Sequence, residues 1–388
     1  MQALTDFHQD IRARTRDVAL KVTAKHAAKH DAAYSVPMET MQALHGNGVL
    51  NICIDKKLGG AGTGMLHGVD PLAYLLVIEE LGRVDMSAAH CFQIQAHTCQ
   101  LFTAAGTDDQ KERYLRPAFD RAALFSWTGS EPGRTARGQY NLISDAKRTQ
   151  GGYVLNGTKN FATLANVAAW NVIAVTVADM LSPDNFLLVT VPQGAAGFVV
   201  DEAWWRPTGM RGAVSPKLEL KDVVVPDRDV VQGPGFYPKS QFGARLHLGF
   251  AANHVGAAQG MLDFAIGYLP KRGTVNSPHS QRSIGEMTMR IEAARLMVYT
   301  AAAMWEGTPR QGAAEYALMA KLMAIATAEW MVNETIRIVG STALLEEYPL
   351  NRFARDVHVH STHANLHNTA QAIGRGALKM NFDATAQQ

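Results

Sequence analysis

The feature that most constrains the fold of this chain is a block of β-branched segments set between two long stretches of helical periodicity. Five runs rich in Val, Leu, Ile and Phe lie in this block, separated by turn residues such as Asn156-Gly157. Outside it, apolar residues recur at helical spacing, as in the helix predicted from Pro71 to Leu81. We therefore predict an α+β, mainly α, protein with an N-terminal all-α domain over 1–120, a central β domain over 121–231 that forms an antiparallel sheet or small barrel, and a C-terminal helical bundle over 232–388.

The composition excludes several classes of protein. Among the 388 residues, 37 Lys and Arg stand against 35 Asp and Glu without a long run of either sign, so neither nucleic acid nor an anionic membrane surface is an expected partner. The three cysteines lack metal-ligand spacing, and no GxGxxG turn of a nicotinamide-binding fold is present. The first residues lack the pattern of a signal peptide, and charged residues such as Lys321 and Glu329 interrupt the longest apolar stretches. We therefore expect a soluble cytoplasmic protein that acts on a small molecule.

Four motifs resemble the acyl-CoA dehydrogenase superfamily in their order and spacing. They are Ser130-Glu-Pro-Gly133, Gly152-Tyr-Val-Leu-Asn-Gly-Thr-Lys159, Gly209-Met-Arg-Gly212 and Glu347-Tyr-Pro-Leu-Asn-Arg-Phe-Ala-Arg-Asp356. The fold that this resemblance implies, an N-terminal helical domain, a central β domain and a C-terminal four-helix bundle, agrees with the order of segments described above. The resemblance also implies a flavin, FAD or FMN, between the β domain and the bundle, and a homotetramer whose cofactor sites are shared between subunits.

The same resemblance implies which residues lie along the isoalloxazine ring. They are Trp127, Gly129, Ser130, Phe161, Ala162 and Thr163, on two strands of the β domain. Backbone N–H groups and a hydroxyl are suited to this place because they can polarise the flavin ring. Ser130 and Thr163 also fit the alternative of ordinary strand hydroxyls.

Two further residues match the part of the family that binds the dinucleotide end of the flavin. Arg272 matches an arginine that reaches the diphosphate from a neighbouring subunit, and Gly340 matches a glycine-rich loop on the adenosine side. Val275 and Asn276 stand where the family has Phe and Gly. A solvated loop arginine is therefore the alternative for Arg272.

The catalytic base of an acyl-CoA dehydrogenase has no counterpart in the sequence. Its two positions in the family fall on Ala364 and Leu246, and neither side chain can remove a proton. The family's Gly-Ser-Asp, which helps to hold the CoA-bearing substrate, is replaced within Glu131-Pro-Gly-Arg-Thr-Ala-Arg137. We therefore expect that acyl-CoA is not the substrate.

Histidines stand in place of the missing carboxylate. His358, His360 and His363 follow the Arg-Asp pair, and a histidine here resembles the flavin-dependent monooxygenase branch of the superfamily, the two-component enzymes like dibenzothiophene monooxygenase. Imidazole can donate and accept a proton near neutral pH, which oxygen chemistry on a reduced flavin requires. His363 is the first catalytic candidate. His97, with His90 as its competitor, is the second, because that branch places a histidine of the N-terminal domain over the flavin.

The sequence therefore predicts a flavin-dependent monooxygenase that receives reduced FAD or FMN from a separate NAD(P)H:flavin reductase and uses O₂ to oxygenate a small hydrophobic or aromatic molecule. The alternatives are an FAD-dependent acyl-CoA or acyl-carrier dehydrogenase with a relocated base, and a non-catalytic protein of the same fold. The histidines also fit a helix surface. His360 and His363 beside Asp356 further fit part of a metal site, but the ligand set is incomplete and we expect no metal.

Overall fold

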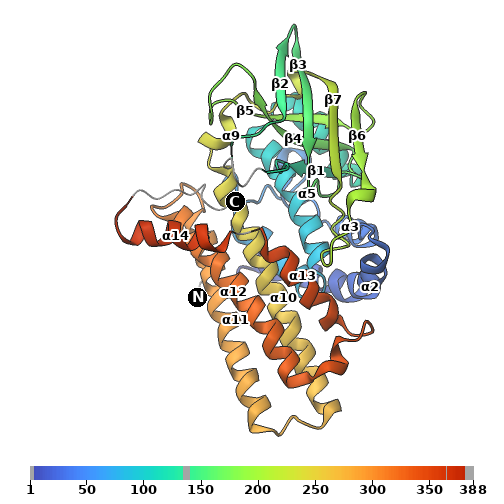
Figure 1. The fold of residues 1–388 in the computed structure, drawn as a ribbon, viewed down its shortest axis with the longest axis vertical. Coiled ribbons are helices and arrows are strands. Elements are labelled where there is room, and N and C mark those ends of the chain that lie inside the picture. The colour runs from blue at the N-terminus through green and yellow to red at the C-terminus, as the bar shows by residue number, and fades with distance from the viewer. Residues whose placement is uncertain (1–3, 134–139, 364, 381–388) are drawn as a thin grey trace.

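The computed structural model describes residues 4–133, 140–363 and 365–380, in which a seven-stranded sheet lies between two helical regions of the chain. The sheet occupies one end of the molecule and the long C-terminal helices extend from it (Figure 1). This order of a helical region, a sheet and a second helical region is the one that the sequence predicts. The predicted limit after residue 120 falls at the last residues of the helix that precedes the sheet, and the limit after residue 231 falls between the last strand and the following helix. Within the part of the chain that the structure describes, no helix combines the length and the apolar character that crossing a membrane requires.

The N-terminal region consists of helices of very different burial. They are α1 (Asp6–Val18), α2 (Ala24–Ala33), α3 (Met38–Gly46), α4 (Pro71–Gly82), α5 (Met86–Ala105), α6 (Asp108–Gln110) and α7 (Arg116–Arg121). The helix predicted from Pro71 is confirmed: Pro71 occupies its first turn, and the Asp70 carboxylate accepts a hydrogen bond from the N–H of Ala73. Helix α5 lies between the sheet and the C-terminal helices and is buried along nearly its whole length. Its polar residues therefore face the interior, which a helix tolerates only when they have a partner or a ligand.

The sheet contains all five predicted strands and two more. Its strands are β1 (Phe125–Thr128), β2 (Asp145–Thr149), β3 (Gly152–Lys159), β4 (Trp170–Val177), β5 (Phe186–Pro192), β6 (Phe198–Asp201) and β7 (Lys217–Pro226). The order is β1-β4-β2-β3-β7-β6, with β5 also paired to β4. The expectation of a purely antiparallel sheet is wrong, because β4 runs parallel to both β1 and β2. A β-branched run indicates a strand but carries no information on its direction, which the connections decide.

The C-terminal region is built on three long helices. The helices are α9 (Phe236–Lys239), α10 (Phe242–Arg272), α11 (Pro278–Met304), α12 (Ala313–Val339), α13 (Pro349–Ser361) and α14 (Leu366–Ala377). Helices α10, α11, α12 and α13 pack together, and α10 also packs on α4 and α5 of the N-terminal region. Alanine at the contact positions, such as Ala317, Ala320 and Ala324 of α12, lets the helix axes approach closely.

Two of the sequence motifs contact each other across the junction of sheet and bundle. The N–H of Met210 donates to the carboxylate of Asp356 at 2.5 Å, and the Arg355 guanidinium donates to the Thr208 carbonyl. Gly209 lies against the backbone of Arg355, so that a side chain at 209 would collide with it. These contacts fix the start of the segment that carries the histidines at a defined place beside the sheet.

Candidate functional site

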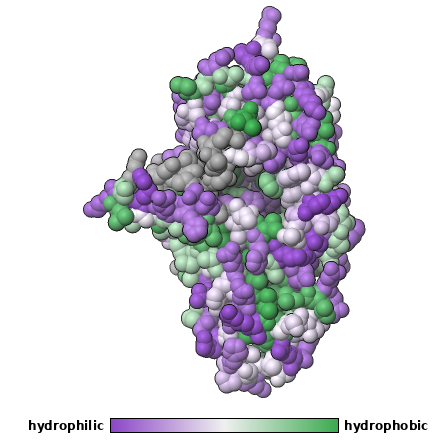
Figure 2. Space-filling model, viewed as in Figure 1, coloured by the Kyte–Doolittle hydropathy of each residue, from purple (hydrophilic) through white to green (hydrophobic). Residues whose placement is uncertain are grey.

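A cavity of about 720 Å³ lies where α5, α10, the sheet and the segment after α13 meet. The molecular surface is hollowed between the sheet region and the bundle (Figure 2). Most of the residues that the sequence singled out line this cavity: Trp127, Gly129, Ser130, Phe161, Thr163, Leu246, His90, His97 and His363.

The face of α5 that borders the cavity carries buried polar side chains. His90, Gln93 and His97 all line it and are almost completely buried. Within the described part of the chain, both amide atoms of Gln93 and Nε2 of His97 make no hydrogen bond. Burial lowers the pKa of His97 to about 3, so its ring is neutral at physiological pH. Because an unpaired buried polar group costs free energy, these atoms indicate a polar ligand in the cavity.

The predicted flavin residues divide into those that face the cavity and one that does not. Gly129 and Ser130 follow the end of β1, and the Trp127 ring meets His97 edge to face at 4.6 Å. Ala162 lies outside the cavity lining: its side chain belongs to the core of the sheet, and its N–H donates to the Pro216 carbonyl at 3.1 Å. A direct contact of Ala162 with a ligand in this cavity therefore has no support in the structure.

The resemblance implied that the segment around Thr163 is a strand, but in the structure it is a turn after β3. Phe161 adopts a left-handed φ of 55°, and Thr163 makes only a single bridge to Trp127. Ser130 likewise lies beyond its strand, so the alternative of ordinary strand hydroxyls does not hold for either residue. Phe161 is 54% exposed although it is a large aromatic residue, which places its ring at the cavity entrance beside Trp204.

Arg272 and Gly340 lie outside the cavity, at the far end of the bundle. The guanidinium of Arg272 donates to the carbonyl of Val339 and packs against Gly340. Arg272 is therefore an exposed residue at the last turn of α10 that is hydrogen-bonded to its own chain, and it does not lie in a loop. Whether these two residues also face the flavin of a neighbouring subunit stays a prediction.

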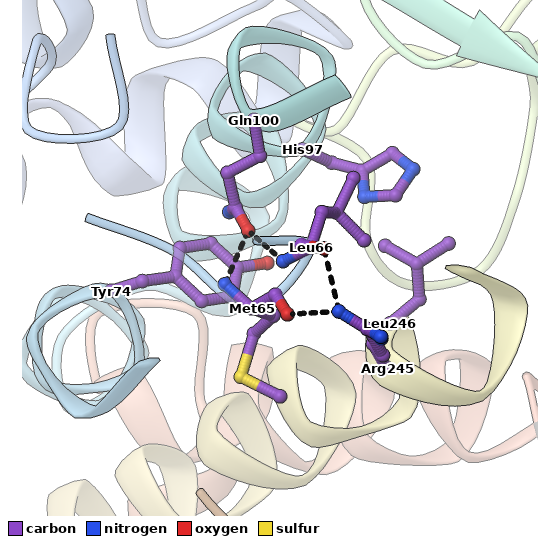
Figure 3. Close-up of a pocket in the computed structure, with 7 residues that line it drawn as sticks. All are labelled: Met65, Leu66, Tyr74, His97, Gln100, Arg245 and Leu246. Atoms are coloured by element: carbon purple, nitrogen blue, oxygen red, sulfur yellow. Dashed lines mark hydrogen bonds between the residues drawn. The ribbon is translucent and has the colours of Figure 1, made fainter. Parts of the chain in front are cut away.

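The two positions that hold the catalytic base in the family are occupied by Leu246 and Ala364, and neither residue has a carboxylate. Leu246 forms part of the cavity wall beside His97, and Arg245 next to it donates to the carbonyls of Met65 and Leu66 (Figure 3). The second base position, Ala364, lies outside the described residues. The changed part of the CoA motif, residues 134–137, does so as well. The backbone N–H groups of Met65 and Leu66 donate to the side-chain carbonyl of Gln100, so hydrogen bonds connect this segment to both α5 and α10.

Glu131 is the one carboxylate among the described residues that line the cavity, and it is already neutralised. Its carboxylate is 2.7 Å from the Lys159 ammonium, and both side chains are fully buried. It also accepts hydrogen bonds from the N–H groups of Ile143 and Ser144. Burial alone would raise the pKa of Glu131, but the charge of Lys159 and these hydrogen bonds lower it below its usual value. A carboxylate held in this way anchors the loop after Ser130 and is a poor proton acceptor.

Histidines of three elements form a cluster at one side of the cavity. The ring of His363 stacks on Phe250 at 4.7 Å and lies 4.8 Å from His360 and 5.4 Å from His90. Of the two competing candidates on α5, His90 therefore adjoins His363, whereas His97 lies two turns away against Trp127. His358 is exposed on α13, so the surface alternative applies to it and not to the buried His360.

A chain of hydrogen bonds connects this cluster to the sheet. Nε2 of His90 is 3.2 Å from the Thr163 hydroxyl, which is 2.8 Å from the hydroxyl of Ser215. Nδ1 of His90 is 3.3 Å from Nε2 of His360. Burial lowers the pKa of His90 to about 3 and of His363 to about 4, so the cluster is neutral at pH 7. Ser215 is a member that the sequence did not reveal, since a single serine in a loop has no distinguishing pattern.

The metal alternative is not supported by the geometry. Asp356 points to the N–H of Met210 rather than to the histidines. Among the described residues, no three His, Cys, Asp or Glu side chains converge in a way that would hold a metal ion.

Lys321 is a second residue of the site that sequence reasoning missed. This lysine of α12 is fully buried, and its ammonium is 2.9 Å from Nδ1 of His247 and 2.7 Å from the carbonyl of His363, to which it donates. In the sequence Lys321 is a single lysine within an otherwise apolar helical stretch, a pattern that by itself indicates only that the stretch does not span a membrane.

Models of one protein family match three successive parts of the chain. They are described as acyl-CoA dehydrogenase, N-terminal domain at residues 5–121, middle domain at residues 127–223 and C-terminal domain at residues 248–368. The probable acyl-CoA dehydrogenase YngJ of Bacillus subtilis is 30% identical over 373 residues, which cover 91% of this chain and 93% of YngJ.

Two solved structures share the fold over nearly the whole chain. Butyryl-CoA dehydrogenase from Megasphaera elsdenii is 25% identical with a TM-score of 0.87 and covers 97% of this chain and 100% of its own. FMN-bound TdsC from Paenibacillus sp. A11-2, a dibenzothiophene monooxygenase, is 19% identical with a TM-score of 0.86 and covers 97% of this chain and 98% of its own. At that identity the likeness to TdsC concerns the fold alone. Since the models of all three domains match in order and YngJ is 30% identical over most of the chain, this chain belongs to the acyl-CoA dehydrogenase superfamily of flavin-dependent oxidoreductases.

Proposed function

We propose that the protein is a flavin-dependent monooxygenase in which neutral histidines take the place of the dehydrogenase base. The observation that carries the proposal is the make-up of the cavity wall. Leu246 stands at one base position, Glu131 is paired with Lys159, and His90 and His363 face the same space. A proton α to a thioester therefore has no free carboxylate acceptor among the described residues that line the cavity, whereas the site is rich in neutral imidazoles that can both donate and accept a hydrogen bond.

The residues present fit a flavin. The cavity is large enough for a tricyclic ring, and it offers the hydroxyls of Ser130 and Thr163 together with the unpartnered atoms of Gln93 and His97. The residues that would hold the ring along its edge are Trp127, Gly129, Ser130, Phe161 and Thr163. When bound and reduced, the flavin supplies the two electrons that activate O₂.

The protonation state of His363 follows from its hydrogen bond. Its Nδ1 is 3.0 Å from the carbonyl of His360, and since a carbonyl only accepts, Nδ1 carries the proton. The neutral ring thus presents the lone pair of Nε2, and a substrate or oxygen-derived O–H group in the cavity can donate to it. The stacking of His363 on Phe250 holds this ring in place and excludes water from one of its faces.

The relatives support a second candidate, an FAD-dependent acyl-CoA or acyl-carrier dehydrogenase with a relocated base. All three domain models and YngJ carry the dehydrogenase name. In this chain the base would have to be a histidine such as His363, whose low pKa of about 4 makes it a weak acceptor.

A test that needs no knowledge of the substrate separates the two candidates. Protein is mixed with dithionite-reduced FMN or FAD and then with oxygenated buffer, and hydrogen peroxide release is followed against free reduced flavin. The monooxygenase proposal expects the protein to delay peroxide release, and addition of an accepted aromatic compound to transfer ¹⁸O from ¹⁸O₂ into product. Peroxide release as fast as from free flavin, with anaerobic bleaching of the bound oxidised flavin by butyryl-CoA, would establish the dehydrogenase instead.

The supply of electrons and the assembly state belong to the same proposal. We infer that a separate NAD(P)H:flavin reductase provides the reduced flavin, so NADH alone should not reduce the protein-bound flavin until such a reductase is added. A homotetramer, measured by light scattering, is expected if Arg272 and Gly340 serve a neighbouring subunit as the family resemblance implies.

A further inference from the structure

Lys321 is a buried cation next to the cavity, and none of its described neighbours neutralises it. The groups that face it are His247 and His254 from α10, His360 from α13 and the carbonyl and ring of His363. None of these is a carboxylate, and within the described residues no ion pair includes Lys321. The ammonium also lies 5.2 Å above the ring of Phe250, a weak electrostatic partner. A buried ammonium without a counter-charge is costly, so the geometry suits an anion that arrives with a ligand.

His247 connects this charge to the cavity. It lines the cavity wall, whereas Lys321 lies behind it. When Lys321 is protonated its ammonium donates to Nδ1 of His247, and the neutral ring must then carry its own proton on Nε2. The lysine therefore holds His247 as a hydrogen-bond donor toward the cavity. This is the opposite polarity to His363, whose Nδ1 donates to the His360 carbonyl and whose Nε2 accepts.

We propose that the substrate of this cavity is a hydrophobic or aromatic molecule that carries an oxyanion, a carboxylate or a phenolate, and that His247 receives the oxyanion with Lys321 as its positively charged positioning residue. The assignment deepens the proposed function, since it rests on this cavity being the substrate site. A charge-assisted hydrogen bond in a site of low dielectric is the strongest kind available to a protein, and it would orient the rest of the ring toward the flavin edge.

The arrangement has a consequence for the pH dependence of binding. Burial lowers the pKa of Lys321 to about 7, while His247, His254, His360 and His363 all have pKa values shifted below their usual value. Above pH 6 Lys321 is therefore the group of this cluster that titrates. An oxyanion prefers the protonated lysine, so binding takes up a proton and the affinity falls as the pH rises through the pKa of Lys321.

The test is equilibrium dialysis of the protein loaded with oxidised FMN against two probes of nearly equal size, benzoate and benzamide, which differ in charge. At about pH 6 the wild type should bind benzoate roughly tenfold or more tightly than benzamide, as expected for a charge-assisted hydrogen bond. At about pH 9 that preference should be lost. In Lys321→Met the preference should be absent at both values of pH, while benzamide binding stays as in the wild type.

Two further variants keep the test decisive. His247→Leu removes the donor but leaves the lysine, and it should also abolish the preference. It therefore serves as the test if Lys321→Met does not fold. Lys239→Met removes an exposed surface lysine and controls for net charge. Equal affinity of the wild type for both probes, or an unchanged preference in folded Lys321→Met, would overturn the proposal. Because binding is measured without turnover, its failure is distinguishable from failure of the monooxygenase proposal.

Discussion

The buried pair of Glu131 and Lys159 allows a quantitative prediction. Removal of the lysine tests whether Glu131 is a structural anion or a catalytic group. Both side chains are fully buried, 2.7 Å apart, and the carboxylate accepts two backbone hydrogen bonds. Lys159→Met keeps the length of the side chain but removes the ammonium from the carboxylate. Removing one partner of such a pair costs about 3–5 kcal/mol in the free energy of unfolding at neutral pH.

The pH dependence gives the sign of the effect. The pKa of Glu131 is lowered in the folded protein, so its contribution to stability is present above the unfolded pKa of about 4.3 and is lost as the pH falls through the folded value. In Lys159→Met the folded pKa should instead be raised by burial. Since the unfolded pKa is the same in both proteins, the difference in stability should be large at pH 7 and shrink as the pH falls from the raised folded pKa of the variant to the lowered folded pKa of the wild type.

The assay is urea unfolding followed by tryptophan fluorescence, with flavin binding measured in parallel because Ser130 directly precedes Glu131. The double variant Glu131→Gln/Lys159→Met should be less destabilised than the sum of the two single variants, since the pair is lost together. A Lys159→Met protein as stable as wild type at pH 7, or a stability difference that grows toward acid, would refute the reasoning.

The structure also predicts the outcome of three further substitutions, two in the cavity and one at the far end of the bundle. His363→Ala should leave flavin binding intact but release more hydrogen peroxide per O₂ consumed, because the acceptor at Nε2 is gone; coupling as in wild type would remove His363 from the proposed catalytic role. Ser130→Val should weaken flavin binding roughly two- to tenfold in a fluorescence titration, the value of one hydrogen bond, and an unaltered Kd would exclude that contact. Gly340→Ala should lower the free energy of unfolding by about 1–3 kcal/mol, because a φ of 85° with ψ of 173° is open essentially to glycine alone, and an unchanged thermal midpoint would contradict this expectation.

Much of the architecture follows from local pattern. Each of the five β-branched runs forms a strand, and Pro71 begins a helix as expected, because alternation, turn residues and capping act over a few neighbouring positions. The absence of a carboxylate at Leu246 was equally visible in the sequence, since the identity of a residue at a motif position needs no coordinates. In the structure Leu246 does border the cavity.

What the tertiary structure decided are relations between residues far apart in the chain. Three such relations depend on the path of long connecting segments. They are the parallel pairing of β1 with β4, the burial of Ala162 in the sheet core and the contact of His90 with Thr163. Lys321 is the clearest case. In the sequence it is a single charge on an apolar helix, and only the packing of α12 against α10 and the end of α13 places its ammonium on His247 and His363. Spacing along one helix indicates which face a residue shares, whereas the chemistry of a buried charge depends on the other helices that surround it.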